Sequence, residues 1–130
     1  MDIERVIYSR DTTHAGLAAL ISARCYPGIL PQNPTLPALT YQLISDPMVK
    51  RVFTGVTNMR YPRVQVDCWA TTYSGCTALT VQVRAAFQNY AVVSSDLSLK
   101  FKIVDGDFDN YEPDSLWFRR SVDLRLWYKL

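Results

Sequence analysis

Catalysis in this chain would have to use His14, because it is the only histidine. A Ser-His-Asp or Cys-His arrangement needs such an imidazole as its base, but no flanking motif supports either one. The residues around His14 have the composition of a helix start, so a capping or surface role is expected for it. We therefore predict that the protein is not an enzyme. The alternative, a small enzyme, would need a second titratable group close to His14.

Metal and cofactor sites are not expected either. The chain contains no GxGxxG or P-loop sequence that could hold phosphate groups. Its cysteines are odd in number and lack the CxxC spacing of zinc sites. We expect all three to be reduced thiols of the core: Cys25, Cys68 and Cys76.

Residues 105–114, here called the acidic segment, resemble the opening of a calcium loop. Their carboxylates belong to Asp105, Asp107, Asp109, Glu112 and Asp114. Asn110 stands where the sharp turn of that loop needs glycine, and Leu116 stands where a bidentate glutamate is needed. We therefore predict an acidic, solvated hairpin turn rather than a calcium site.

Residues 50–63, here called the basic segment, mix cations with aromatic side chains, as loops that bind single-stranded nucleic acid do. The residues concerned are Lys50, Arg51, Phe53, Arg60, Tyr61 and Arg63. Four cations give little affinity for phosphates at physiological salt, and the net charge of the chain is only +2. Sequence-specific nucleic-acid binding is therefore not expected. Because residues 46–62 show no regular periodicity, they are predicted to form either a long functional loop, which we favour, or a segment that is mobile in the isolated subunit.

The hydrophobic period changes from two to about 3.6 within residues 63–87. Apolar residues first alternate with polar ones, as a half-buried strand requires, at Val64, Val66, Cys68 and Ala70. They then recur at intervals of three and four, as in an amphipathic helix, at Cys76, Leu79, Val83, Ala86 and Tyr90. The pattern predicts a strand that runs directly into a helix packed on the same sheet.

The remaining periodicity predicts a single α+β domain over residues 1–130. Residues 3–21 indicate one interrupted helix or two short ones, and four prolines favour an ordered connection over residues 25–37. Alternation predicts strands at residues 39–44, 97–103 and 118–130, the last two forming a long antiparallel hairpin. The expected architecture is one mostly antiparallel β-sheet with two helices packed on one face.

The outward face of two predicted strands, here called the outer face, is rich in tryptophan and arginine. It carries Arg63, Gln65, Asp67, Trp69, Trp117, Arg119, Ser121, Asp123, Arg125 and Trp127. Tryptophan and arginine are enriched at protein interfaces, so this face is a candidate contact with another subunit. Alternatively, the tryptophans cover the edges of their own sheet and the charges pair across strands, for example Asp67 with Arg125.

Three stretches of the chain together resemble the tail-completion, or tail-terminator, family of tailed bacteriophages, prophages and gene transfer agents. They are CYPGILPQNPTLPALTYQLIS at residues 25–45, RVQVDCWATTYSGCTALTVQVRAAF at 63–87 and RRSVDLRLWY at 119–128. The resemblance extends over almost the whole chain. It departs at residues 46–61 and 105–117, so partner contacts in those segments cannot be carried over from the family.

The resemblance implies a small structural virion protein that assembles as a hexameric ring on the head-proximal end of the tail tube. There the ring would stop polymerisation of the tube and provide the surface for head-tail joining. The implied partners are further copies of the chain, the tail tube protein and a head-completion or neck protein. Transient contact with DNA in the lumen is compatible with the basic segment. A head-completion or neck connector of the same particle stays as the alternative.

A ring requires two different, complementary patches on each subunit. Their opposite charge makes the basic and acidic segments candidates for these patches. The predicted contact residues are Lys50, Arg51, Phe53, Arg60, Arg63, Trp69, Asp105, Asp107, Asp109, Trp117, Arg119, Arg125 and Trp127. No stretch has the roughly 18 to 20 apolar residues that span a bilayer, and no signal peptide or membrane partner is expected. We expect the protein in the host cytoplasm during assembly and in the virion tail or neck afterwards.

Overall fold

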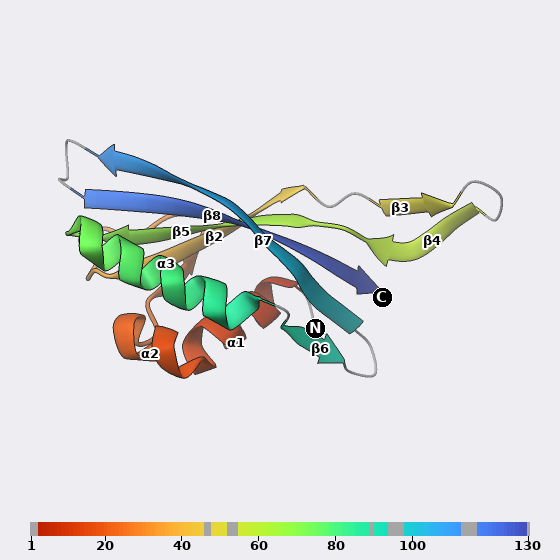
Figure 1. The fold of residues 1–130 in the computed structure, drawn as a ribbon, viewed down its shortest axis with the longest axis horizontal. Helices are drawn as coiled ribbons and strands as arrows, with labels where there is room; N and C mark the ends of the chain where they lie inside the picture. The colour runs from red at the N-terminus through yellow and green to blue at the C-terminus, as the bar shows by residue number, and fades with distance from the viewer. Residues whose placement is uncertain are drawn as a thin grey trace.

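The computed structural model describes residues 3–45, 48–51, 55–88, 90–93, 98–112 and 117–129. Within these ranges the protein has three α-helices and one curled β-sheet of eight strands (Figure 1). Phe53, one of the predicted contact residues, lies outside the described residues. None of the described helices is long and apolar enough to cross a bilayer.

The N-terminal part of the chain forms two helices, α1 (Ile3–Thr13) and α2 (Ala15–Ile21). His14 lies between them, and its Nδ1 atom accepts a hydrogen bond from the backbone N–H of Leu17 at 3.4 Å. The imidazole therefore caps α2, as the sequence predicted. Together with α3 (Tyr73–Phe87), the described residues contain three helices and not the predicted two.

The strands form one mixed sheet. They are β1 (Cys25–Pro27), β2 (Ala38–Ser45), β3 (Met48–Arg51), β4 (Gly55–Arg60), β5 (Arg63–Ala70), β6 (Ala91–Val93), β7 (Ser98–Glu112) and β8 (Trp117–Lys129). The strand order is β1-β2-β5-β8-β4-β3, and β7 pairs with β8 and β6. The predicted sheet is corrected to a mixed one, because β1 pairs with β2 in parallel, whereas the other described strand pairs are antiparallel. Residues 25–37 were expected to be a plain connection, and β1 occupies their first three residues.

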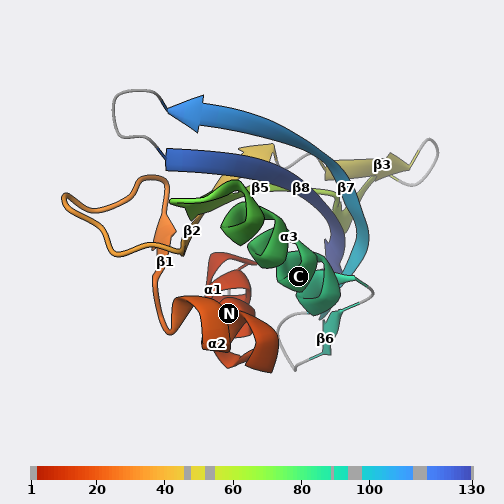
Figure 2. The same ribbon diagram turned by 60° about the vertical axis from the view of Figure 1, so that its left-hand side comes forward.

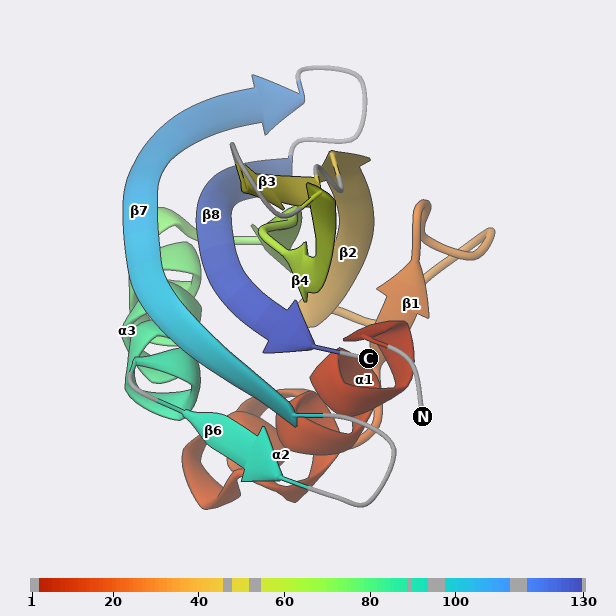
Figure 3. The ribbon, with the colours of Figure 1, turned by 90° about the vertical axis from the view of Figure 1, so that its right-hand side faces the viewer.

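Residues 105–112 of the acidic segment are part of a strand, which corrects the predicted hairpin turn, and the last two residues of the segment lie outside the described residues. Residues 98–112 form β7, which pairs with β8 from Ser98↔Lys129 to Glu112↔Trp117. The register shifts at Lys102 and at Gly106, so each is an extra residue of β7 relative to β8. Such bulges bend a strand, and Figure 3 shows β7 and β8 curved into an arc. The pairing with β8 makes this segment a strand even though its own sequence lacks apolar alternation.

The predicted long loop at residues 46–62 is also corrected. β3 and β4 pair as an antiparallel hairpin, with Lys50↔Val56 and Arg51↔Gly55 in register. This hairpin joins the rest of the sheet through two residue pairs of β4 and β8, Met59↔Lys129 and Arg60↔Tyr128. In Figure 1 it extends away from the helices. The basic segment therefore lies mainly on a hairpin that shares few contacts with the body of the protein.

One hydrophobic core joins the helices to the sheet, and Figure 2 shows the helices along one side of the sheet. β5 runs almost directly into α3, as the change of hydrophobic period predicted. Phe87 of α3 is fully buried, and its ring centre lies 4.9 Å from that of Phe101 in β7. All three cysteines are buried free thiols, as predicted.

Replacing Thr72 with alanine tests how the strand-to-helix unit is stabilised. Thr72 Oγ1 accepts a hydrogen bond from the backbone N–H of Gly75 at 3.0 Å and caps α3. Loss of this cap is expected to lower the free energy of unfolding by about 1 kcal/mol in urea denaturation. The control is Thr77→Ala, which removes a hydroxyl bonded to the Tyr73 carbonyl of the same helix and leaves the cap intact. Equal losses in the two variants would contradict the capping role.

Candidate functional site

The outer face is built by the register of β5 against β8. Gln65 is paired with Asp123, Asp67 with Ser121, and Trp69 with Arg119. The buried residues between them, such as Val66 and Leu124, belong to the core on the opposite face. The sequence therefore assigned the two faces of these strands correctly.

Two tryptophans and an arginine gather at one end of this face. The ring centres of Trp69 and Trp117 lie 6.4 Å apart with an edge-to-face angle of 87°. The guanidinium carbon of Arg119 lies 5.3 Å from the centre of the Trp69 ring, within the range of cation–π attraction. The Trp69 indole N–H donates to Thr40 Oγ1 of β2 at 3.0 Å, which fixes the ring on the sheet. Three predicted contact residues are thus brought together here.

A polar network follows along the same face. Asp67 is only 7% exposed, and its Oδ1 atom accepts hydrogen bonds from Ser121 Oγ at 2.5 Å and from Gln65 Nε2 at 2.9 Å. The suggested pair of Asp67 with Arg125 is wrong, because the register places Asp67 opposite Ser121. The ion pair on this face joins Arg63 Nη2 to Asp123 Oδ2 at 2.6 Å.

Aromatic contacts dominate the other end of the outer face. The ring centres of Tyr61 and Trp127 lie 4.2 Å apart. The guanidinium carbon of Arg125 lies 5.4 Å from the centre of the Tyr61 ring. Arg63 and Arg125 are paired in register on neighbouring strands. Asp123 forms an ion pair with Arg63, and the Tyr61 ring lies beside Arg125.

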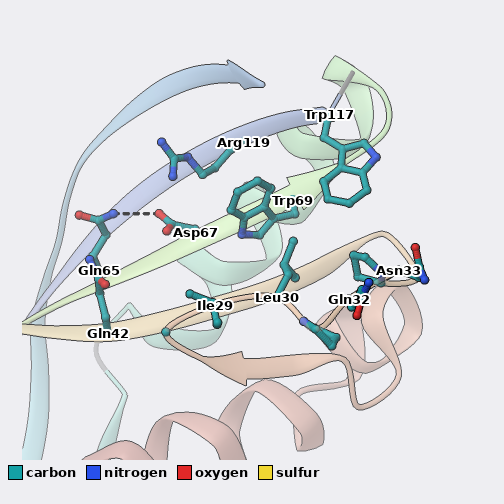
Figure 4. A pocket seen from close by; sticks show the side chains of 13 residues that line it. Ile29, Leu30, Gln32, Asn33, Gln42, Gln65, Asp67, Trp69, Trp117 and Arg119 are labelled. Carbon is teal, nitrogen blue, oxygen red and sulfur yellow. Dashed lines mark hydrogen bonds between the residues drawn. The ribbon is translucent and has the colours of Figure 1, made fainter. Parts of the chain in front are cut away.

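A groove of about 620 Å³ lies between the outer face and the loop of residues 28–34 (Figure 4). Its sheet side is lined by Gln42, Gln65, Asp67, Trp69, Trp117 and Arg119, and its loop side by residues 28–34. The loop begins with Gly28, whose φ of 77° suits glycine and whose N–H donates to the Tyr41 carbonyl at 2.8 Å. Ile29 of the loop is 82% exposed.

The groove was not predicted, although several of its residues were. Trp69, Trp117 and Arg119 were candidate contact residues, whereas Gln42 and the loop of residues 28–34 were not. The sequence signal for the loop was its proline content, which indicated an ordered connection over the surface but not the face that the loop covers.

The remaining predicted residues lie on other strands. Lys50 and Arg51 belong to β3, Arg60 ends β4, and the three aspartates at 105, 107 and 109 belong to β7. β3 ends the strand order on one side of β8, whereas β7 pairs with the opposite edge of β8. The described parts of the basic and acidic segments therefore lie on opposite edges of one sheet.

A second polar cluster lies in the interior. Asp11 of α1 is fully buried, and Cys25 Sγ of β1 donates a hydrogen bond to its Oδ2 atom at 2.9 Å. Burial raises the pKa of Asp11 to about 7, although the bond from Cys25 acts in the opposite direction. Burial and the neighbouring Asp11 raise the pKa of the Cys25 thiol. A thiol held protonated in the core is a poor nucleophile, so this cluster is structural.

No metal centre is built by the described part of the chain, where no three His, Cys, Asp or Glu side chains group closely enough to hold an ion. His14 lies beside Arg10, and desolvation, followed by the charge of Arg10, lowers the pKa of its imidazole. Among the described residues, the outer face and its groove are the candidate functional site, because they bring together two tryptophans, an arginine and a polar network.

Comparison with known proteins identifies similar folds and a family. A chain from the virion of a native gene transfer agent particle has the same fold, with a TM-score of 0.69 at 17% identity, over 98% of this chain and 95% of that one. A second solved structure has a TM-score of 0.61 at 13% identity, over 99% of this chain and 95% of its own. No curated protein matches the sequence. The family described as tail completion protein gp17 matches residues 5–129, and the chain therefore belongs to that family.

Proposed function

We propose that the protein forms a ring at the head-proximal end of a phage or gene transfer agent tail tube, where it terminates tube polymerisation and joins the tail to the head. The observation that carries this proposal is the family match over residues 5–129. A contact surface rich in tryptophan and arginine supports it, because a ring subunit must bind neighbours on several sides. The protein is structural and has no catalytic role.

The two charged segments are the proposed contacts between subunits of the ring. They lie on opposite edges of one sheet, which suits the head-to-tail interfaces of a closed ring. Among the described residues, β6 covers only the start of β7, from Ser98 to Lys100, and leaves the edge of the acidic part without a strand partner. β3 is likewise a terminal strand. An acidic edge and a basic edge can pair between subunits through backbone hydrogen bonds and opposite charge.

The further proposed partners follow from the same position in the particle. The ring would bind the tail tube protein on one side and a head-completion or neck protein on the other. Its lumen would allow transient contact with DNA. Assembly would take place in the host cytoplasm, and the finished ring would stay in the tail or neck of the virion.

Electron microscopy of particles from a deletion of this gene tests the proposal. Filled heads without tails, together with tubes of overrun length, are expected, and a plasmid copy of the gene should restore normal particles. Tails of normal length beside heads that leak or fail to join would instead identify a head-side connector. Normal particles without the gene would exclude both functions.

A further inference from the structure

Asp67 is a carboxylate that folding has almost removed from solvent. Oδ1 accepts the bonds from Ser121 and Gln65, at 2.5 and 2.9 Å. In the described residues the hydrogen bonds of this carboxylate end on Oδ1, and Oδ2 is not one of the buried atoms without a partner, so it stays accessible from the groove. The side chain lines the groove, as Figure 4 shows. Asp67 Oδ2 can therefore accept a hydrogen bond from a ligand that enters the groove.

Because Asp67 is only 7% exposed, few water molecules can solvate its charge, and a cation that binds beside Oδ2 in the groove would be attracted to it. The groove also suits the uncharged part of such a cation. Trp69 and Leu30 line it from opposite sides, and their apolar surfaces can cover a hydrocarbon stem. Gln42 adds an amide that can bond to further N–H groups.

We propose that the groove binds an arginine side chain presented by an extended segment of a different protein. Arginine fits better than lysine, because its planar guanidinium can donate several hydrogen bonds to Asp67 and Gln42 and can stack on an indole ring. This inference concerns the groove alone and does not depend on ring formation.

Arg119 restricts which segments can bind. Its guanidinium lies over Trp69 and lines the same groove as Asp67. A run of several cations would be repelled by this charge, whereas a single arginine can bind beside Asp67 while the carbonyl groups around it accept hydrogen bonds from Arg119. The expected ligand is therefore one arginine flanked by uncharged residues. The basic segment of a second copy has several cations and fits less well.

Titration with two tripeptides, followed by NMR of the Trp69 and Trp117 indole N–H signals, tests the proposal. N-acetyl-Ala-Arg-Ala-amide is expected to shift these signals saturably, with a Kd of about 1 mM that weakens as salt is added. The matched probe contains citrulline, which has nearly the shape of arginine but no charge. Its affinity is expected to be at least about tenfold lower, because a charge-assisted bond is lost. Equal binding of both peptides by the native protein would overturn the proposal without the use of any variant.

Two variants locate the binding site. Asp67→Asn is expected to weaken binding of the arginine peptide about tenfold or more. The control, Asp123→Asn, removes a carboxylate of the same face that is paired with Arg63 and does not line the groove, so it should leave the Kd unchanged. Equal effects of the two variants would overturn the site assignment. If the arginine peptide dissociates assembled rings, the occupant is a second copy, and the assignment to a different protein is wrong.

Discussion

A Lys50→Glu, Arg51→Glu double variant is expected to remain a folded subunit that no longer assembles. Both residues lie on β3, whose outer edge is proposed to meet the acidic edge of β7 of the next subunit. The change places two glutamates, in place of two cations, opposite the acidic segment of the next subunit, so that attraction between the edges becomes repulsion. Like charges at an interface cost several kcal/mol, so the concentration needed for assembly should rise by about two to three orders of magnitude.

Size-exclusion chromatography with light scattering and negative-stain microscopy would measure this loss. The additional changes Asp107→Lys and Asp109→Lys restore opposite charges and should recover part of the assembly. Lys100→Glu is the control, because it reverses a charge on the part of β7 that β6 already covers and should leave assembly unchanged. If the fourfold variant is folded and still monomeric, the proposed pairing of the two edges is wrong.

Asp11 is expected to make the stability of the native protein fall as the pH rises from about 4 to about 7. Burial raises its pKa from 3.8 to about 7, so between these values the folded state keeps a proton that the unfolded state releases. The contribution of the neutral carboxyl is present in full below pH 4 and is lost as the pH rises toward 7. For a shift of this size, the linked change in the free energy of unfolding is about 4 kcal/mol.

The Asp11→Asn variant tests this dependence, because its amide stays neutral at every pH. Urea denaturation at pH 5 and at pH 8 would compare the two proteins. The variant should gain stability relative to the native protein between these values, by an amount in the range of about 2 to 4 kcal/mol. Asp123→Asn is the control, because it removes a carboxylate in another part of the protein that is ion-paired with Arg63. Parallel pH curves for native and Asp11→Asn protein would show that Asp11 does not titrate in this range.

The conformations of two segments, residues 46–62 and 105–112, were predicted wrongly from the sequence. Residues 105–112 carry acidic side chains at alternate positions, which is typical of a solvated turn and equally of a strand at the edge of a sheet. Their pairing with β8 decides between the two. The β3–β4 hairpin was not predicted for a similar reason, because its sequence lacks apolar alternation, and among the described residues β4 pairs with β8 at Met59 and Arg60.

The candidate site, too, was predicted only in part from the sequence. Periodicity placed Trp69, Trp117 and Arg119 on the outer face, because side chains of a strand alternate between its two sides. The partner of Asp67 depended on how β5 and β8, which lie 54 residues apart at this point, align. The groove depended on a loop that folds back over the face, which no local pattern indicates.

The sequence by itself determined the strand-to-helix unit at residues 63–87, the two faces of β5 and β8, the buried thiols and a capping or surface role for His14. Each of these follows from local periodicity or from a single helix start. Only the tertiary structure decided the mixed pairing of the sheet, the strand formed by the acidic segment, the polar network of Asp67 and the groove. These features arise from contacts between distant parts of the chain, and their free energy depends on register and packing that no short stretch of sequence contains.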